Sequence, residues 1–237
     1  RFYLTVVWNG QWFKWENRNT NFLYGQPDGG PTHDAPQNGY LNRSRVSLDY
    51  IPRDNNHPYR PAIIFRMAEA YLSYAEALNE SSERMSHKQE ILDNLNKIRH
   101  RAGIAEYGTG TDENGFTRIK INFSDQKEVR RLIHKERRVE FVGEGVRYHD
   151  LRRWKTAHYG IGNLNEQGEN PDWGVNGPDY GMNYYGTEYT DQGDNAFFKR
   201  TKYMDRVYPR KFYWYPIHQS EIDKDPTLVQ GPFWLGE

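Results

Sequence analysis

The chain has 237 residues, enough to bury the core of one large domain or of two smaller ones. Its 32 Lys and Arg residues balance 32 Asp and Glu residues, so it lacks the basic excess expected of a protein that binds nucleic acid. It contains no cysteine, which excludes disulfides, thiolate nucleophiles and cysteine-bound metals, and no apolar run reaches the roughly 18 residues of a membrane-spanning helix.

Residues 1–16 predict a β-hairpin. Apolar residues alternate up to Asn9-Gly10, which is a strong signal for a two-residue turn. Folding about that turn pairs Val7 with Trp12 and places Trp12 on the wetter face. The face expected to join the core carries Leu4, Val6, Phe13 and Trp15. Residues 17–60 are rich in Asn, Gly, Pro and Asp and predict loop.

Residues 61–157 predict helices. Between 61 and 80 the apolar positions recur at steps of four and three, which is a helical stripe. They are Ile64, Ala68, Tyr71, Ala75 and Leu78. Ser86 and Gln89 form a capping box that opens a second helix, and Gly103 supplies its C-cap. Its stripe is Ile91, Leu95, Ile98 and Ala102. A short connection between two amphipathic helices predicts an antiparallel hairpin.

A second unit of the same kind follows. Asp125 and Glu128 resemble a second capping box, opening a helix with an apolar stripe, and a fourth helix is expected over 146–156. Two helical hairpins of this kind are typical of tetratricopeptide-like repeats. The predicted fold class is therefore mainly α, with helical hairpins, a small N-terminal β-hairpin and long irregular loops.

Residues 158–237 predict an aromatic-rich loop and a C-terminal strap laid over a core. No helical or strand period survives in 158–196, which is dense in Gly, Asn, Asp and Tyr. Its interleaved aromatic residues argue against plain disorder, and a long irregular loop in a compact domain is typically functional. These residues are Trp173, Tyr180, Tyr184, Tyr185 and Tyr189.

Three groups of residues stand out as ordered motifs. The first two are residues 66–80 (RMAEAYLSYAEALNE) and 95–103 (LNKIRHRAG). The third comprises residues 136–141 (ERRVEF), 144–147 (EGVR) and 150–154 (DLRRW). Together they resemble the motifs of the SusD/RagB family of outer-membrane nutrient-binding lipoproteins. The strand-and-turn opening at 1–10 and the closing Tyr215-Pro216-Ile217 also fit, so the resemblance spans nearly the whole chain.

The resemblance implies a C-terminal SusD/RagB-type domain over 1–237, with an α/α superhelix. It implies a non-catalytic protein that binds an oligosaccharide or polysaccharide and acts with a SusC-like TonB-dependent transporter. It also implies a place on the surface of a Gram-negative outer membrane, held by an N-terminal lipid anchor that this chain does not carry. No cofactor is expected.

The charged residues of these motifs are interpreted as scaffold rather than as acids or bases. Glu136 falls on an apolar helical stripe, where a charge needs a partner, and Arg101, Arg137 or Arg147 could supply it. Asp150 is expected to pair with Arg147 and Arg153 in the same way. These ion pairs are expected to be structural.

Recognition is assigned to exposed aromatic rings, because a flat ring covers the apolar face of a sugar while polar neighbours bind its hydroxyl groups. The candidate glycan-binding residues are Trp12, Trp173, Tyr180 and Tyr184. No metal site is expected, and Asp112-x-Asn114-Gly115 is interpreted as a glycine turn rather than a calcium loop.

Two other functions stay open. A glycoside hydrolase would need two facing carboxylates, with Asp172, Asp179, Glu188 and Asp191 as loop candidates. The third possibility is a repeat-type protein-interaction module that uses its aromatic residues for contact and binds no glycan.

Overall fold

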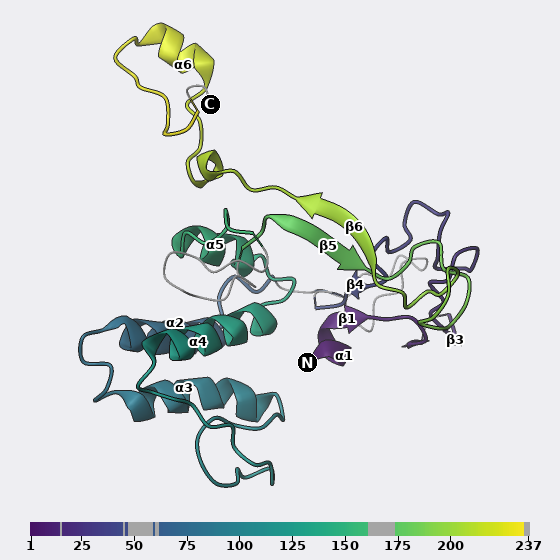
Figure 1. Cartoon of the computed structure of the whole chain (residues 1–237), viewed down its shortest axis with the longest axis horizontal. Coiled ribbons are helices and arrows are strands. Elements are labelled where there is room, and N and C mark those ends of the chain that lie inside the picture. Colours follow the sequence, from purple (N-terminus) through teal and green to yellow (C-terminus); the bar gives the residue numbers. More distant parts are fainter. Residues whose placement is uncertain (15, 45, 47–58, 60–61, 161–173, 235–237) are drawn as a thin grey trace. The chain divides into compact units, whose positions relative to one another are not determined.

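The chain folds into two compact units in a computed structural model (Figure 1). The structure describes residues 1–14, 16–44, 46, 59, 62–160 and 174–234. The first unit comprises Arg1–Arg147 with Asn183–Lys199, and the second comprises Tyr148–Met182 with Arg200–Glu237. Residues 183–199 are thus flanked in sequence by residues of the second unit but belong to the first unit.

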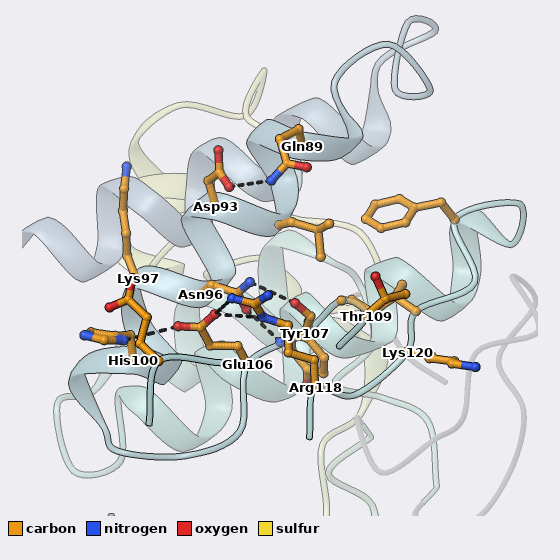
Figure 2. A pocket seen from close by; sticks show the side chains of 15 residues that line it. Gln89, Asp93, Asn96, Lys97, His100, Glu106, Tyr107, Thr109, Arg118 and Lys120 are labelled. Atoms are coloured by element: carbon orange, nitrogen blue, oxygen red, sulfur yellow. Dashed lines mark hydrogen bonds and ion pairs between the residues drawn. The ribbon is translucent and has the colours of Figure 1, made fainter. Parts of the chain in front are cut away.

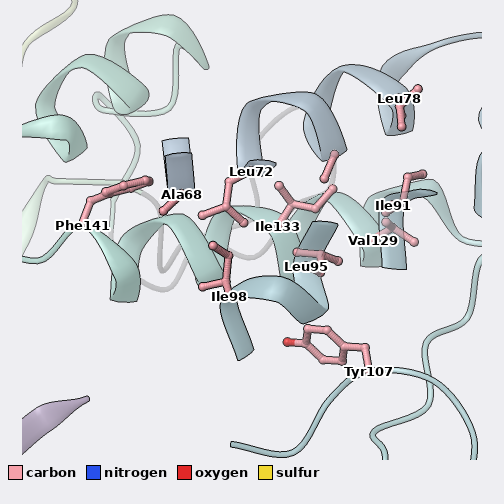
Figure 3. Packing of buried hydrophobic residues seen from close by; sticks show 11 residues of the cluster. Ala68, Leu72, Leu78, Ile91, Leu95, Ile98, Tyr107, Val129, Ile133 and Phe141 are labelled. Carbon is pink, nitrogen blue, oxygen red and sulfur yellow. The ribbon is translucent and has the colours of Figure 1, made fainter. Parts of the chain in front are cut away.

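Three long helices form the core of the first unit, and the predicted mainly helical fold is confirmed. α2 (Met67–Glu80) packs against both α3 (Lys88–Arg101) and α4 (Gln126–Glu140). Figure 3 shows the apolar side chains meeting between these helices. The buried residues of this core are Ala68, Leu72, Ala75, Leu78, Ile91, Leu95, Ile98, Tyr107, Val129, Ile133 and Phe141. The antiparallel hairpin of α2 and α3 is the one that the apolar spacing predicts.

The predicted stripe of the first long helix holds except at its N-terminal end. Ala68, Ala75 and Leu78 are buried on α2, but Ile64 is 96% exposed. The helix begins at Met67, so Ile64 precedes it and the helical period does not apply to its side chain. The predicted start of this helix was too early.

One of the two predicted capping boxes is wrong. α3 starts after His87 with no side-chain cap, and the Ser86 hydroxyl donates to the carbonyl of Glu83 instead. At α4 the Asp125 carboxylate accepts from the backbone N–H groups of Lys127 and Glu128 at 2.9 and 3.2 Å, as an N-cap does. α3 ends as expected, because Gly103 adopts a φ of 62° just past it.

The N-terminal strands pair in a register that differs from the prediction. Residues Phe2–Thr5 form a short helix, α1, and β1 (Val6–Val7) pairs with β4 (Leu41–Asn42). β2 (Trp12–Phe13) pairs with β3 (Arg18–Asn19) rather than with β1. The predicted hairpin about Asn9-Gly10 is therefore wrong.

Thr20 explains the change of partner. Its carbonyl accepts from the N–H of Gly10, its N–H donates to the carbonyl of Gln11, and its hydroxyl donates to the carbonyl of Trp8 at 2.7 Å. The predicted turn itself forms, since the N–H of Gln11 donates to the carbonyl of Trp8 at 3.2 Å, but the Gln11 carbonyl now accepts from Thr20 and the strands on either side of the turn pair elsewhere. The prediction that one face of this hairpin joins the core is also wrong, since Leu4 is 74% exposed and Phe13 is exposed too. Trp15 lies outside the described residues.

The second unit contains a strand pair that the sequence did not predict. β5 (Gly177–Gly181) pairs antiparallel with β6 (Thr201–Arg206) through a register shift at Asp179 and Tyr180. Gly and Pro in β5 hide the strand signal, because both residues are depleted in strands. Leu151, Ala157 and Tyr208 form the small hydrophobic core of this unit.

The remaining elements of the second unit are short helices. α5 (Val146–Arg153) starts at the end of the first unit, and η1 (Arg210–Tyr213) and α6 (Gln219–Lys224) follow β6. The expected pairing of the fourth helix with the third, and the predicted division at 1–60, 61–157 and 158–237, stay predictions.

Within the part of the chain that the structure describes, no helix has the length and apolar character needed to cross a membrane.

Candidate functional site

The charged motif residues form an arginine–glutamate network beside the helical core. Glu136 is 3% exposed and accepts hydrogen bonds from Arg1, at 2.8 Å, and from Arg99. Arg101 instead binds Glu140. The partners found for Glu136, Arg1 and Arg99, were not among the candidates named from the sequence.

Glu140 connects this network to the start of α2. Arg66 donates to Glu140 at 2.5 Å and to Glu144 at 2.7 and 2.9 Å. Burial opposes ionisation of Glu140, but the hydrogen bonds from Arg101 and Arg66 outweigh it and hold its pKa below the ordinary value. Burial and the nearby charge of Glu136 raise the pKa of Tyr107 to about 12. A carboxylate kept ionised by arginines holds helices together and is a poor proton donor.

The DLRRW motif, residues 150–154, lies in the second unit. Asp150 is buried and accepts from Arg153 at 3.2 Å, while Arg147 is the last residue of the first unit. Trp154 stands in the turn after α5, half-buried, with the Arg153 guanidinium 5.3 Å from its ring centroid. The two printed contacts are an ion pair and a cation–π contact, both made by Arg153.

A groove of about 730 Å³ lies in the first unit between α3 and the segment 106–123 (Figure 2). Its central carboxylate, Glu106, is 7% exposed and binds Arg118 at 2.9 Å and His100 at 3.2 Å. Asn96 exchanges two hydrogen bonds with the backbone of Tyr107. These interactions fasten the segment 106–123 to α3, which accounts for the polar lining.

Asp112 belongs to a turn. Its carboxylate accepts from the backbone N–H groups of Glu106, Asn114 and Phe116, and Gly115 has a φ of 82°. The carboxylate therefore caps its own loop. Among the described residues, no group of three or more His, Cys, Asp or Glu side chains could hold a metal ion.

Aromatic rings gather where 183–199 packs on the N-terminal loop. The N–H of Tyr24 donates to the carbonyl of Gly186 at 2.8 Å. The rings of Tyr24, Tyr184 and Tyr185 lie 5.1 to 6.0 Å apart between centroids, in tilted and edge-to-face arrangements. Gly30 permits this packing, because a Cβ there would lie 2.6 Å from the Tyr184 ring.

Trp12 and Tyr189 extend this group along the same two segments. Trp12 is 58% exposed and stands opposite Asn19 in the β2–β3 pair, which places the indole beside a side-chain amide. The Tyr189 hydroxyl lies 3.5 Å from the position of a Cβ at Gly10, two residues before Trp12. We call Trp12, Tyr24, Tyr184, Tyr185 and Tyr189 the aromatic loop surface.

Behind the aromatic loop surface, two polar contacts fix the β2–β3 hairpin. Arg18 donates twice to Asp28, at 2.6 and 2.8 Å, and Asp28 also accepts from the N–H of Asn21. The hydrogen bonds from Arg18 lower the pKa of Asp28. The strand that carries Trp12 is thus anchored, and its ring is presented on a fixed backbone.

The other candidate residues lie elsewhere. Tyr180 is on β5 in the second unit, 44% exposed, with the Arg200 guanidinium 3.9 Å from its ring centroid. Trp173 and Asp172 fall outside the described residues. Asp179 pairs with Arg206 at 3.3 Å, and Glu188 and Asp191 are exposed on the segment 183–199.

The aromatic loop surface can bind a ligand that offers a flat apolar face and hydrogen-bonding edges. Two of its rings, Tyr185 and Tyr189, are 69% and 65% exposed. Tyr24 was not recognised in the sequence, because its contacts come from residues 160 positions away along the chain. The only local signal was an aromatic residue inside a loop rich in Gly and Asn.

Comparison with known proteins covers nearly the whole chain. The SusD family profile matches residues 1–234. SusD-like protein P25 of Formosa agariphila is 32% identical over 109 residues, which is 46% of this chain and 18% of that protein. SusD-like protein P38 of the same organism is 32% identical over 103 residues, 44% of this chain and 19% of that protein.

Solved structures share the fold. A SusD-like protein from Bacteroides fragilis superposes with a TM-score of 0.65 at 25% identity, covering 98% of this chain and 38% of that one. A SusD-like carbohydrate-binding protein from the same species gives 0.60 at 24% identity, covering 95% and 40%. The chain therefore spans less than half the length of the proteins that it matches. With its helical hairpin, its arginine–glutamate network and these matches, the chain belongs to the SusD family.

Proposed function

We propose that the chain is part of a non-catalytic glycan-binding protein and that the aromatic loop surface contacts the glycan. The observation that carries this proposal is that tyrosine rings from two segments far apart in sequence meet, and that Tyr185 among them is exposed. Trp12, on one of these segments, is also exposed and stands opposite Asn19. Family membership supports it, and so does a SusD-like structure of the same fold that is described as carbohydrate-binding.

The chemistry of the surface suits a sugar. An exposed indole removes the C–H face of a pyranose from water, while amide groups and tyrosine hydroxyls exchange hydrogen bonds with the ring hydroxyls. The carboxylates of Glu136 and Glu140 do not contact the glycan in this proposal, because arginines already bind them. Binding without chemistry needs no tuned acid or base.

The remaining roles follow from the family. We propose that the whole protein acts with a SusC-like TonB-dependent transporter in an outer-membrane nutrient uptake system, as a lipid-anchored protein on the cell surface. The rigid helical core provides a fixed body for such a partner, and the loops are left for the ligand.

Affinity electrophoresis in gels that contain a panel of neutral polysaccharides tests the glycan-binding proposal. The intact chain is expected to be retarded by at least one of them. Trp12→Ala and Tyr185→Ala are each expected to weaken binding about ten-fold, as for a central aromatic contact. Both side chains are largely exposed, so stability is expected to stay within about 0.5 kcal/mol.

Tyr74→Ala is the matched control. Tyr74 is 48% exposed, but it lies on α2 and bonds Glu90, outside the aromatic loop surface. It should leave retardation unchanged. Retardation of the intact chain that survives both Trp12→Ala and Tyr185→Ala would contradict the proposed surface, and no retardation by any polysaccharide would contradict glycan binding.

A further inference from the structure

The second unit contains a cavity of about 450 Å³ built from residues that the aromatic loop surface does not include. Its described lining consists of cationic or protonatable side chains and of aromatic rings. They are Arg152, Lys155, His158 and Arg210, with Tyr159, Tyr213, Trp214 and Phe233. No carboxylate stands among these described lining residues, so the cavity favours a negatively charged ligand that also has an apolar face.

The walls of the cavity are tied together by hydrogen bonds to Tyr213. The N–H of His158 donates to the Tyr213 hydroxyl at 3.2 Å, and Nδ1 of the same histidine lies 2.9 Å from that hydroxyl. Arg152 donates to the Tyr213 carbonyl at 2.7 Å. In the 3₁₀ turn η1, residues three apart lie on one side, so Arg210 and Tyr213 face the same way. The site is pre-formed.

Lys155 carries the second observation. The N–H of Thr156 bonds the carbonyl of Leu151, and the N–H of Lys155 bonds that of Arg152, which is the hydrogen-bond pattern that closes a helix with a left-handed residue. Lys155 is that residue, with a φ of 55°. Glycine is favoured there because it lacks a Cβ. The chain instead keeps an exposed cation at the cavity, in a backbone conformation that lysine rarely adopts.

We propose that this cavity binds an acidic sugar unit, a uronate or a sulfated residue of a glycan. Lys155 and Arg210 attract the anionic group, and Trp214 and Tyr159 pack against the sugar ring. The inference rests on the proposed function in taking the ligand to be a glycan. It adds a site of different chemistry, in the other unit.

Isothermal titration tests the inference with tri-galacturonate, a sulfated galacto-oligosaccharide and neutral galactotriose as probes. At least one acidic probe should bind about ten-fold more tightly than the neutral one. Its affinity should fall as salt is raised, since the Debye length is about 8 Å at 0.15 M. The tighter of the two acidic probes identifies the anionic group. Equal binding of all three probes would overturn the inference.

Lys155→Gly separates binding from folding. Glycine suits the left-handed position, so Tm should be equal or higher, while affinity for the acidic probe should fall about five-fold, as for the loss of one exposed charge contact. Arg210→Gln should lower the same affinity. Lys202→Gln, which removes a lysine paired with Asp205 at 2.5 Å on β6, should not. Unchanged affinity in both Lys155→Gly and Arg210→Gln would overturn the inference.

The two proposals can fail separately. Trp12→Ala should leave the affinity for the acidic probe intact, because Trp12 is not among the described residues that line the cavity. If the affinity for the acidic probe falls in Trp12→Ala and not in Lys155→Gly, the cavity is excluded as the binding site and the aromatic loop surface stands. If Lys155→Gly weakens binding of the acidic probe while no neutral polysaccharide retards the chain, the cavity stands as a binding site and the aromatic loop surface is excluded.

Discussion

Glu136 shows how a charge on an apolar helical stripe is matched by arginine partners. Its carboxylate is almost fully buried, and it is bound by two arginines and lies 3.3 Å from the hydroxyl of Tyr107. Removing one partner of such an arrangement leaves an uncompensated charge in a poorly solvated place. We therefore propose that Glu136 fixes α4 against α3 and the start of the chain.

Glu136→Ala is expected to destabilise the protein by about 3 kcal/mol, because Arg99, itself only 8% exposed, loses its carboxylate partner. Urea unfolding followed by circular dichroism measures the change. Glu83→Ala is the control, since the Glu83 side chain is 79% exposed, and it should stay within about 0.5 kcal/mol. A stable Glu136→Ala variant that has lost glycan binding would show that Glu136 serves recognition instead.

At the residue scale, the sequence predicted the need for a partner at Glu136 but not its identity. Arg1 and Arg99 lie 135 and 37 positions away, and nothing in a helical period says which arginine faces the stripe. Trp12 was predicted to lie on the wetter side, and it is exposed. The approach of the Tyr189 hydroxyl to Gly10, two residues before Trp12, depends on chain packing that no local signal contains.

The start of each helix is decided by a local competition for backbone N–H groups. Asp125 lies before α4 and accepts two of them, whereas Ser86 lies one residue too early for α3 and bonds backward to Glu83. Both positions fit the same sequence pattern. Only the structure distinguishes a cap from a serine in the preceding turn.

Asp125→Ala should therefore lower stability by about 1 kcal/mol through loss of the N-cap, and Ser86→Ala should change it by less than about 0.5 kcal/mol. Thermal unfolding of the two variants beside the parent chain checks the difference. Equal losses at both positions would mean that Ser86 also caps a helix in solution.

At the scale of elements, the three long helices were predictable and the strand pairs were not. Apolar residues at steps of three and four located α2, α3 and α4, because a helix hides its stripe within one contiguous segment. β1 and β5 each pair with a segment about 20 residues or more away, and Gly and Pro obscure β5. Pairings of that kind depend on tertiary context, which also explains the wrong hairpin about Asn9-Gly10.

The whole molecule divides its sequence unevenly between two units. The segment 183–199 returns to the first unit after β5 has begun the second, and it brings Tyr184, Tyr185 and Tyr189 to the loops near Trp12. No composition or period in the sequence predicts that return. The fold class could be predicted from residue patterns, but the candidate surface could not be assembled from them.

We propose that the chain holds a glycan through exposed rings and does not cleave it. Incubating the chain with a polysaccharide that retards it, and following free reducing ends and chain length by chromatography over many hours, tests this directly. The glycan should be recovered at its original length, while Trp12→Ala should lose retention. Shorter products formed by the intact chain and abolished by substitution of Glu188 or Asp191, the exposed carboxylates on the segment 183–199, would contradict it.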